Sequence, residues 1–348
     1  MNKIFLFLLL LGFSVSAQIK NIKIVDKENN SPIADSDIYF TQSTKNFISD
    51  QNGKAILDLQ NIAPNDELII AKKDYQNAVF KISELKADEL IIQLEKVDEI
   101  ELQETFITNL KAKDILQKVI DHYEKNFTAE QHYYKVNLTH DAIIDSINRD
   151  YINVDLQLRF KNNQVKIHSN GKANDRIVGE GMHQKWDYRL LHFFNNISLH
   201  RLIESMHKKL VEKTYDEEKV WLTKYADKYM YELKFKNNKF NVINYFLIDK
   251  ETFAIVEHTT TQENQLYEKQ NDFVVYYGLT YKYRPYKNRW ILKESQSSGS
   301  TIYLDEMKNK HILDRKLNLE VKDFSDQPFP EFNQSVNEKM DIRKSFKD

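Results

Sequence analysis

The chain contains no cysteine. This absence excludes disulfides, thiolate metal sites and cysteine nucleophiles. A protein without disulfides must rely on a hydrophobic core, and a chain of 348 residues is long enough to bury one or two. Glycine and proline are also scarce, at 7 and 5 residues, whereas tyrosine and phenylalanine number 19 and 20. This composition favours ordered strands over flexible linkers.

An excess of charge of one sign is missing as well. The formal net charge is −2, and acidic and basic residues are interspersed along the chain. Such a chain lacks the basic patch with which proteins bind nucleic acid. After the first seventeen residues, no apolar run approaches the roughly 20 residues that a membrane-spanning helix needs. The sequence therefore predicts no nucleic-acid partner and no transmembrane span in the mature chain.

Residues 1–17 have the three parts of a signal peptide. Lys3 supplies a short positive region, residues 4–13 are almost entirely apolar, and Val15-Ser16-Ala17 places small residues before a cleavage point. We expect cleavage after Ala17, and the alternative is an uncleaved membrane anchor. No cysteine follows, which argues against a lipid anchor. The sequence predicts export to the periplasm, or association with the outer membrane.

Short strands follow at close intervals, and turn-rich segments separate them. Asp50-Gln51-Asn52-Gly53 is a tight turn that needs the positive φ of glycine. The strands are predicted over 22–25, 37–40, 47–48, 55–59, 67–71 and 90–94. This pattern predicts a small all-β sandwich.

Several elements of this segment match a family pattern in order and spacing. Ile22–Asp26 corresponds to a G-x-V-x-D opening without its glycine, and Ser49–Ala55 corresponds to a T-D-x-x-G-x-F element. Further matches are Pro32-Ile33, Ser36–Phe40, Asp74-Tyr75 and Leu102–Ile107. The segment resembles the carboxypeptidase-regulatory-like (prealbumin-type) domain of exported proteins of Gram-negative envelopes. The resemblance implies a rigid accessory module without catalytic residues.

Two amphipathic helices are predicted in the rest of the chain. Residues 111–127 carry an apolar stripe with a period near 3.6, and residues 199–210 carry a second one. The first stripe consists of Ile115, Leu116, Val119, Ile120, Tyr123 and Phe127. Each stripe is typical of a helix that packs against a sheet.

The central stretch of the chain is 240–261, where two apolar, β-branched runs flank the polar turn 249–252. This arrangement predicts a β-hairpin in the middle of a large antiparallel sheet. Further strands are predicted over 133–138, 151–160, 164–168, 229–235, 273–283, 289–294, 300–304 and 317–324. The fold class is therefore an all-β N-terminal sandwich plus an α+β C-terminal domain, which has a large curved antiparallel sheet and about two helices. The predicted divisions are a signal peptide (1–17), the sandwich (18–96), a connector (97–110), the α+β domain (111–326) and a polar C-terminal tail (327–348).

A second resemblance concerns this sheet. The run F-L-I-D-x-x-T-F-A-I at 246–255, followed by N-R-W-I-L at 288–292, is similar to the strands of lipoprotein-localisation-factor-like periplasmic proteins. Those proteins form a half-open barrel. The resemblance implies that one face of the sheet wraps helices and can hold lipid.

Sequence patterns for catalysis are scarce. The chain has no phosphate-binding glycine loop, no G-x-S-x-G and no H-E-x-x-H. A group of histidines and acids stands out instead: His183, His192, His200 and His207, with Glu180, Asp187 and Glu204. A zinc pair on a helix needs a spacing of three or four residues, whereas His200 and His207 are about 10 Å apart along a helix axis. The sequence predicts solvated or interface histidines on a polar helix face, no metal site and no cofactor.

The three tryptophans, Trp186, Trp221 and Trp290, are the candidate ligand-binding residues, and no catalytic residue is assigned. Their alternative role is packing in the sheet core. We expect a non-enzymatic exported envelope protein that binds a lipid, a lipoprotein or a partner outer-membrane protein through its C-terminal sheet. The alternatives are a secreted hydrolase with a site near 179–207 and a purely structural adaptor.

Overall fold

A computed structural model of the chain describes residues 19–97, 110–128, 130–161, 164–179, 199–225, 228–267, 272–305, 307–337 and 346. For 199–201 it describes the backbone only. The chain divides into two compact units. The N-terminal unit comprises Met1–Gln103 with Lys224–Asp227, and the C-terminal unit comprises Glu104–Thr223 and Lys228–Asp348.

The N-terminal unit consists of two small sheets that share one core. Its strands are β1 (Ile19–Asp26), β2 (Asp37–Phe40), β3 (Asn46–Ile48), β4 (Lys54–Asp58), β5 (Glu67–Ala71), β6 (Ala78–Lys81) and β7 (Glu89–Leu94). One sheet has the order β4-β1-β7 and the other β3-β2-β5-β6. Ile24 and Leu57 of the first sheet are fully buried together with Phe40, Leu68 and Ile70 of the second. The all-β N-terminal sandwich is therefore confirmed.

Two of the family-motif residues in this unit bond to each other. Asp26 Oδ1 accepts the backbone N–H groups of Glu28 and Asn29, and Tyr75 donates its hydroxyl to Asp26 Oδ2 at 2.9 Å. Burial, followed by this hydrogen bond, raises the pKa of Tyr75 to about 12. The pair fixes the turn after β1, so both residues have a structural role.

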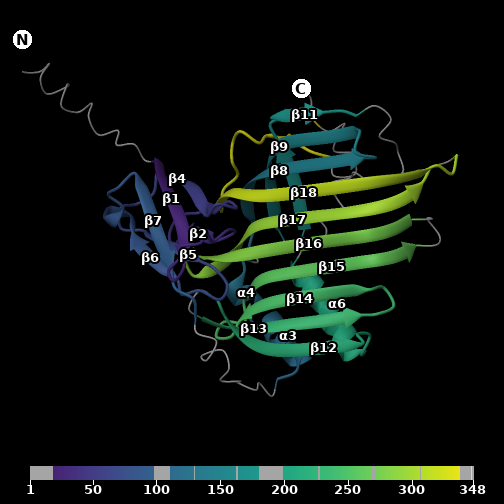
Figure 1. Cartoon of the computed structure of the whole chain (residues 1–348), viewed down its shortest axis with the longest axis horizontal. Coiled ribbons are helices and arrows are strands. Elements are labelled where there is room, and N and C mark those ends of the chain that lie inside the picture. The colour runs from purple at the N-terminus through teal and green to yellow at the C-terminus, as the bar shows by residue number, and fades with distance from the viewer. Residues whose placement is uncertain are drawn as a thin grey trace, which may run out of the picture. The chain divides into compact units, whose positions relative to one another are not determined.

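One large antiparallel sheet dominates the C-terminal unit. Its strands are β8 (His132–Ile144), β9 (Asn148–Lys161), β10 (Gln164–Ser169), β11 (Asp175–Ile177), β12 (Glu217–Tyr225), β13 (Lys228–Asn237), β14 (Val242–Asp249), β15 (Ile255–Tyr267), β16 (Asp272–Tyr286), β17 (Arg289–Leu304), β18 (Lys310–Ser325) and β19 (Gln334–Ser335). The order is β12-β13-β14-β15-β16-β17-β18-β8-β9-β10-β19, and β11 pairs with β9 (Figure 1). The hairpin at 240–261 is confirmed as β14 and β15, but these are the third and fourth strands of the order, so the hairpin lies nearer the β12 edge than the middle.

Helices cover one face of this sheet (Figure 1). They are α3 (Ala112–Asp121), α4 (Tyr123–Asn126) and α6 (Leu199–Val211), and α3 packs against α6. The prediction of one helix over 111–127 is wrong at its middle, because the backbone leaves helical geometry at His122 (φ −101°, ψ 5°). There the His122 ring packs against Phe253, with 5.4 Å between ring centroids. No helix within the described ranges is long and apolar enough to cross a membrane.

The core of the C-terminal unit lies between the helices and the sheet. Ile115 and Leu116 of α3 are fully buried, as are Leu138, Leu156 and Phe246 of the sheet. The segment 327–348, which the sequence predicts to be a polar tail, also contributes to this core. Its residues Val336 and Phe346 are 9% and 2% exposed.

The strand β17 corrects the sequence prediction. The sequence suggests separate strands at 289–294 and 300–304, since Ser295-Gln296-Ser297-Ser298-Gly299 is typical of a loop. In the structure this segment pairs with β16 on one side and with β18 on the other. The backbone hydrogen bonds of two neighbouring strands keep it extended despite its low strand propensity.

A histidine between two aspartates joins two hairpin ends of the sheet. His311 Nδ1 lies 2.7 Å from Asp145 Oδ2 in the β8–β9 turn, and His311 Nε2 lies 3.3 Å from Asp305 Oδ2 after β17. The hydrogen bond with Asp145 is the main reason that the pKa of His311 is raised. A raised pKa means that the folded state holds the proton more tightly than the unfolded chain does.

We therefore expect stability to fall as pH rises through the pKa of folded His311. The contribution of His311 is complete below its unfolded pKa of about 6.5 and is lost above the raised folded value. Urea midpoints between pH 6 and pH 9 would measure this loss. In His311→Gln the pH-dependent fall should be smaller, and parallel curves for both proteins would contradict the assignment.

Candidate functional site

The face of the large sheet that carries the core, here called the inner face, contains a row of polar residues. His258 of β15 lies opposite Tyr281 of β16, which lies opposite Ser295 of β17. Phe246 of β14 and Leu319 of β18 continue the row on either side. We call His258, Tyr281 and Ser295 the polar row; apolar side chains flank it at both ends.

The polar row is buried and includes an unpartnered atom. Its three residues are 1%, 1% and 0% exposed, in the order His258, Tyr281 and Ser295. Within the described part of the chain His258 Nδ1 has no hydrogen-bond partner, and Tyr281 Oη and Ser295 Oγ have none beyond their contact with each other. Buried polar atoms are normally paired, and each unpaired one costs about 1–3 kcal/mol. The row thus places an unpartnered histidine nitrogen beside two hydroxyls whose hydrogen-bonding capacity is only partly used.

The hydrogen bonds around His258 define its protonation. Thr260 Oγ1 donates to Asn244 Oδ1 at 2.8 Å, so its oxygen accepts from His258 Nε2 at 3.3 Å. Nε2 therefore carries the proton, and Nδ1 presents a lone pair. Burial lowers the pKa of His258 to about 3, so the ring is neutral at physiological pH. Burial also raises the pKa of Tyr281, which keeps its hydroxyl protonated.

The geometry of the aromatic rings holds the row in place. The Phe246 and His258 rings stack with 4.4 Å between centroids, and the His258 and Tyr281 rings are nearly parallel at 6.2 Å. The row therefore presents one acceptor, one hydroxyl donor and one further hydroxyl, all uncharged. This set suits a neutral polar group such as an ester, an amide or a protonated carboxyl.

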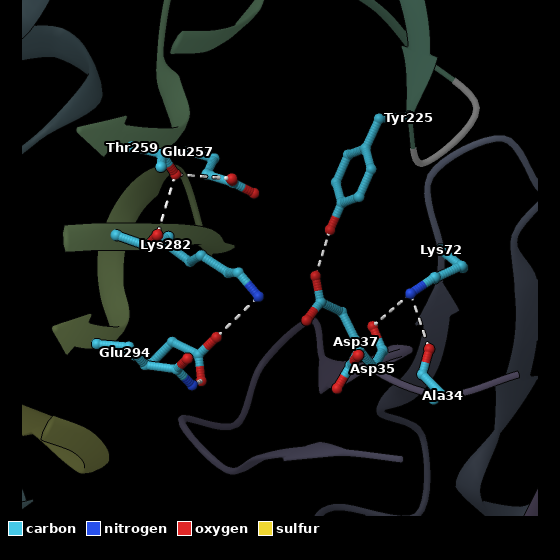
Figure 2. Close-up of polar contacts among 11 residues, drawn as sticks. Ala34, Asp35, Asp37, Lys72, Tyr225, Glu257, Thr259, Lys282 and Glu294 are labelled. Carbon is cyan, nitrogen blue, oxygen red and sulfur yellow. Dashed lines mark hydrogen bonds and ion pairs between the residues drawn. The ribbon is translucent and has the colours of Figure 1, made fainter. Parts of the chain in front are cut away.

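Polar groups on the opposite face of the same strands are paired instead (Figure 2). Thr259 Oγ1 donates to Glu257 Oε1 at 3.1 Å and lies 3.0 Å from Thr280 Oγ1. Lys282 Nζ lies 3.0 Å from Glu294 Oε1. On this face the threonine hydroxyls contact each other and the lysine pairs with the glutamate.

The row does not have the geometry of a nucleophile and its base. His258 and Ser295 are separated by β16, and two strand spacings amount to about 9–10 Å. A serine nucleophile and its histidine base need to lie about 2.6–3.2 Å apart. Within the described ranges, no group of three or more histidine, aspartate or glutamate residues could hold a metal ion. The arrangement supports binding through neutral hydrogen bonds.

The tryptophans named from the sequence are not gathered at this row. Trp186 lies outside the described residues. Trp221 is 36% exposed on β12, whereas Trp290 is partly buried against the core at the start of β17. The strands β12 and β17 are separated by four others in the sheet order. A ligand-binding role for the tryptophans stays a prediction.

The histidine-rich region is largely outside the described residues, which include neither His183 and His192 nor Glu180 and Asp187. Only the backbone of His200 is described. Glu204 is exposed and His207 half-buried on α6. Gly179 donates its N–H to Asp150 Oδ1 at 2.7 Å, which gives this glycine a structural role.

Sequence reasoning missed the polar row for two reasons. His258 and Tyr281 stand at core-facing positions of strands in which buried and exposed residues alternate. The same alternation in the sequence could have indicated that both side chains are buried. Ser295 stands in the segment that reads as a loop, so its alternation is not apparent without the pairing of β17.

Comparison with known proteins gives limited similarity. No protein-family model matches the chain, and no curated protein matches it. The resemblance of the N-terminal segment to the prealbumin-type domain therefore stays a prediction.

Solved structures show a weak similarity. One is an outer membrane lipoprotein-sorting protein domain from Vibrio parahaemolyticus, with 8% identity, a TM-score of 0.25, and coverage of 60% of this chain and 90% of that one. Another is a LolA superfamily protein from Nitrosomonas europaea, with 11% identity, a TM-score of 0.24, and coverage of 64% and 96%. A third is lipovitellin, from a structure of its lipid–protein interactions, with 9% identity, a TM-score of 0.26, and coverage of 60% and 27%. The first two names belong to the class that the strand pattern of 246–292 resembles, but TM-scores at this level establish no common fold.

Proposed function

We propose that this protein is a non-enzymatic exported envelope protein that binds a lipid or the acylated part of a lipoprotein on the inner face of its C-terminal sheet. The observation that carries the proposal is the polar row. Its histidine nitrogen and two hydroxyls suit the ester or amide group of an acylated ligand. The flanking Phe246 and Leu319, both nearly inaccessible to solvent, suit the acyl chain beside it.

The roles of the three residues follow from their chemistry. The Tyr281 hydroxyl donates to the ligand carbonyl, and the Ser295 hydroxyl donates to the same oxygen or accepts from the ligand. His258 Nδ1 accepts from an amide N–H or a hydroxyl of the ligand. The signal-peptide pattern of residues 1–17 supports export, which the proposal requires.

The first test is native mass spectrometry of the mature protein purified from its own envelope, followed by denaturing extraction. The expected result is a co-purifying species with the mass of an acyl lipid. A mass without any adduct would overturn lipid carriage and would leave the structural adaptor as the better description.

The second test uses Tyr281→Phe and Ser295→Ala with a fluorescent fatty-acid ester as the probe. Each variant is expected to bind about 10-fold more weakly, because one hydrogen bond to the ligand is lost. Matched controls are Tyr276→Phe and Ser298→Ala, whose positions lie on the opposite face of β16 and β17. Equal affinity in all four variants would contradict the site.

The Tyr281→Phe variant also gives a separate prediction for stability. Tyr281→Phe removes a buried hydroxyl whose contact among the described residues is the Ser295 hydroxyl, so the ligand-free protein should be about as stable as the wild type or slightly more stable. Urea unfolding after delipidation measures the difference. A loss of stability would show that the hydroxyl is satisfied within the core, and the row would then be structural only.

A further inference from the structure

A basic depression lies at the hairpin of β9 and β10. Lys166 pairs with Arg159, and Gln164 pairs with Lys161, so these four side chains share one face. They line a depression of about 200 Å³. Ile167 follows Lys166 in β10 and therefore points to the other face of the sheet, where it is buried in the core. The depression thus lies on the face opposite to the polar row.

Three of the four lining residues are cations, and the lining includes no carboxylate. Within the described part of the chain, no ion pair involves Arg159, Lys161 or Lys166. Two other cations of this face are paired: Lys135 Nζ lies 2.8 Å from Glu331 Oε1, and Arg149 Nε lies 2.8 Å from Asp141 Oδ1. The depression therefore concentrates positive charge that neighbouring residues do not neutralise.

Arg159 is held in position by its neighbours. Its Nη2 donates to Gln131 Oε1 at 2.8 Å, and Gln131 Nε2 donates to Tyr133 Oη at 2.5 Å. The Nε atom of Arg159 is buried and has no partner. One edge of the guanidinium is thus fixed, and its buried Nε donor is not used by any other described residue.

His168 follows Lys166 on the same face of β10 and lies in the same positively charged environment. Its pKa is lowered by burial and by the charges of Arg159 and Lys166. Its Nδ1 is also buried without a hydrogen-bond partner. Two orphaned nitrogen atoms therefore accompany the cluster of cations.

We propose that the basic depression formed by Arg159, Lys161, Gln164 and Lys166 binds a phosphate group. A fixed guanidinium gives directional hydrogen bonds to phosphate oxygens, and the two lysines add mobile positive charge. Pockets for drug-sized ligands are commonly about 300–1,000 Å³, so a smaller depression suits a single charged group. The phosphate can belong to a soluble phosphate ester or to a phospholipid headgroup. This site lies on the other face of the sheet, so it does not depend on the lipid site proposed above.

Inorganic phosphate is the first probe. Its binding to the full-length mature protein is measured by isothermal titration calorimetry and by mapping of amide chemical shifts. The expected result is saturable binding with shifts confined to β9 and β10, and acetate should bind more weakly. Lys166→Gln and Arg159→Gln should each weaken phosphate binding about 10-fold or more. The control is Lys316→Gln. Lys316 is exposed on the face of β18 that points away from the core, so the variant removes the same charge and should bind phosphate like the wild type.

A vesicle experiment identifies the source of the phosphate. Vesicles of phosphatidylcholine with phosphatidylglycerol should retain the wild type and release Lys166→Gln if the group is a headgroup. Free phosphate binding without vesicle binding would assign a soluble ester. Both results support the depression as a phosphate site.

Equal phosphate affinity in Lys166→Gln, Arg159→Gln and Lys316→Gln would overturn the proposal, as would equal affinity for acetate and phosphate. Lys161 and Lys166 are exposed, so their glutamine variants should keep the fold. Lys161→Gln therefore serves as a second variant if Arg159→Gln fails to fold. Thermal unfolding of each variant provides the check.

Discussion

Phe346→Ala is expected to destabilise the C-terminal unit by about 3–5 kcal/mol, the usual cost of removing a buried aromatic side chain. Phe346 is 2% exposed and belongs to the main core cluster. Arg176 Nη1 also donates to its carbonyl oxygen at 3.2 Å. Urea unfolding followed by tryptophan fluorescence is the appropriate measurement, because all three tryptophans lie in the C-terminal unit.

The matched control for this variant is Phe240→Ala. Phe240 is 45% exposed, so the same chemical change should cost less than about 1 kcal/mol. Equal, small losses in both variants would show that residue 346 is held loosely, as a polar tail would suggest from sequence.

Gly53→Ala should be the most disruptive single change in the N-terminal unit, with a cost of about 3 kcal/mol. Gly53 has a φ of +71°, and a Cβ at this position would lie 2.3 Å from the Ile24 carbonyl oxygen. Relief by moving the backbone would break the hydrogen bond from Ile24 N to Gly53 O, at 2.7 Å. Alanine therefore introduces both backbone strain and a clash with strand β1.

Gly278→Ala is the control for this glycine. A Cβ at Gly278 would meet only Ser298 Oγ at 3.8 Å, which is ordinary van der Waals contact. Hydrogen exchange of the β1 and β4 amides should accelerate in Gly53→Ala and stay unchanged in Gly278→Ala. Unchanged exchange in both would mean that the 50–53 turn adapts, contrary to its geometry.

The proposed lipid site depends on a balance between burial and hydrogen bonding. In the ligand-free protein His258 Nδ1 gains no hydrogen bond within the described residues, although His258 Nε2 lies 3.3 Å from Thr260 Oγ1. A stable core would place apolar residues at such positions, because buried polar groups without partners are costly. The proposed ligand would supply the hydrogen bonds that these residues lack within the described part of the chain.

Local patterns in the sequence predicted the parts of the fold that depend on neighbours in the chain. The hairpin of β14 and β15 follows from its alternating apolar runs, and its turn follows from Asp249. In the structure Asp249 Oδ1 accepts the backbone N–H groups of Glu251 and Thr252, which is the chemistry of a polar turn. The stripes of α3 and α6 predicted helices for the same reason, since a period near 3.6 marks one buried face.

Contacts between distant segments decided the rest. The serine-rich middle of β17 is extended because β16 and β18 bind both of its edges, and no local propensity shows this. Phe346 is buried because the core of the sheet lies beside it, although its chain neighbours are mostly polar and charged.

The sequence by itself determined the two-part β-rich architecture, the absence of thiol chemistry and the hairpin of β14 and β15. Only the tertiary structure decided which polar residues meet. The polar row joins three strands through register, and the basic depression joins two strands whose four residues share one face. Strand pairing sets these neighbours, and a shift of one residue in register would turn each side chain to the opposite face.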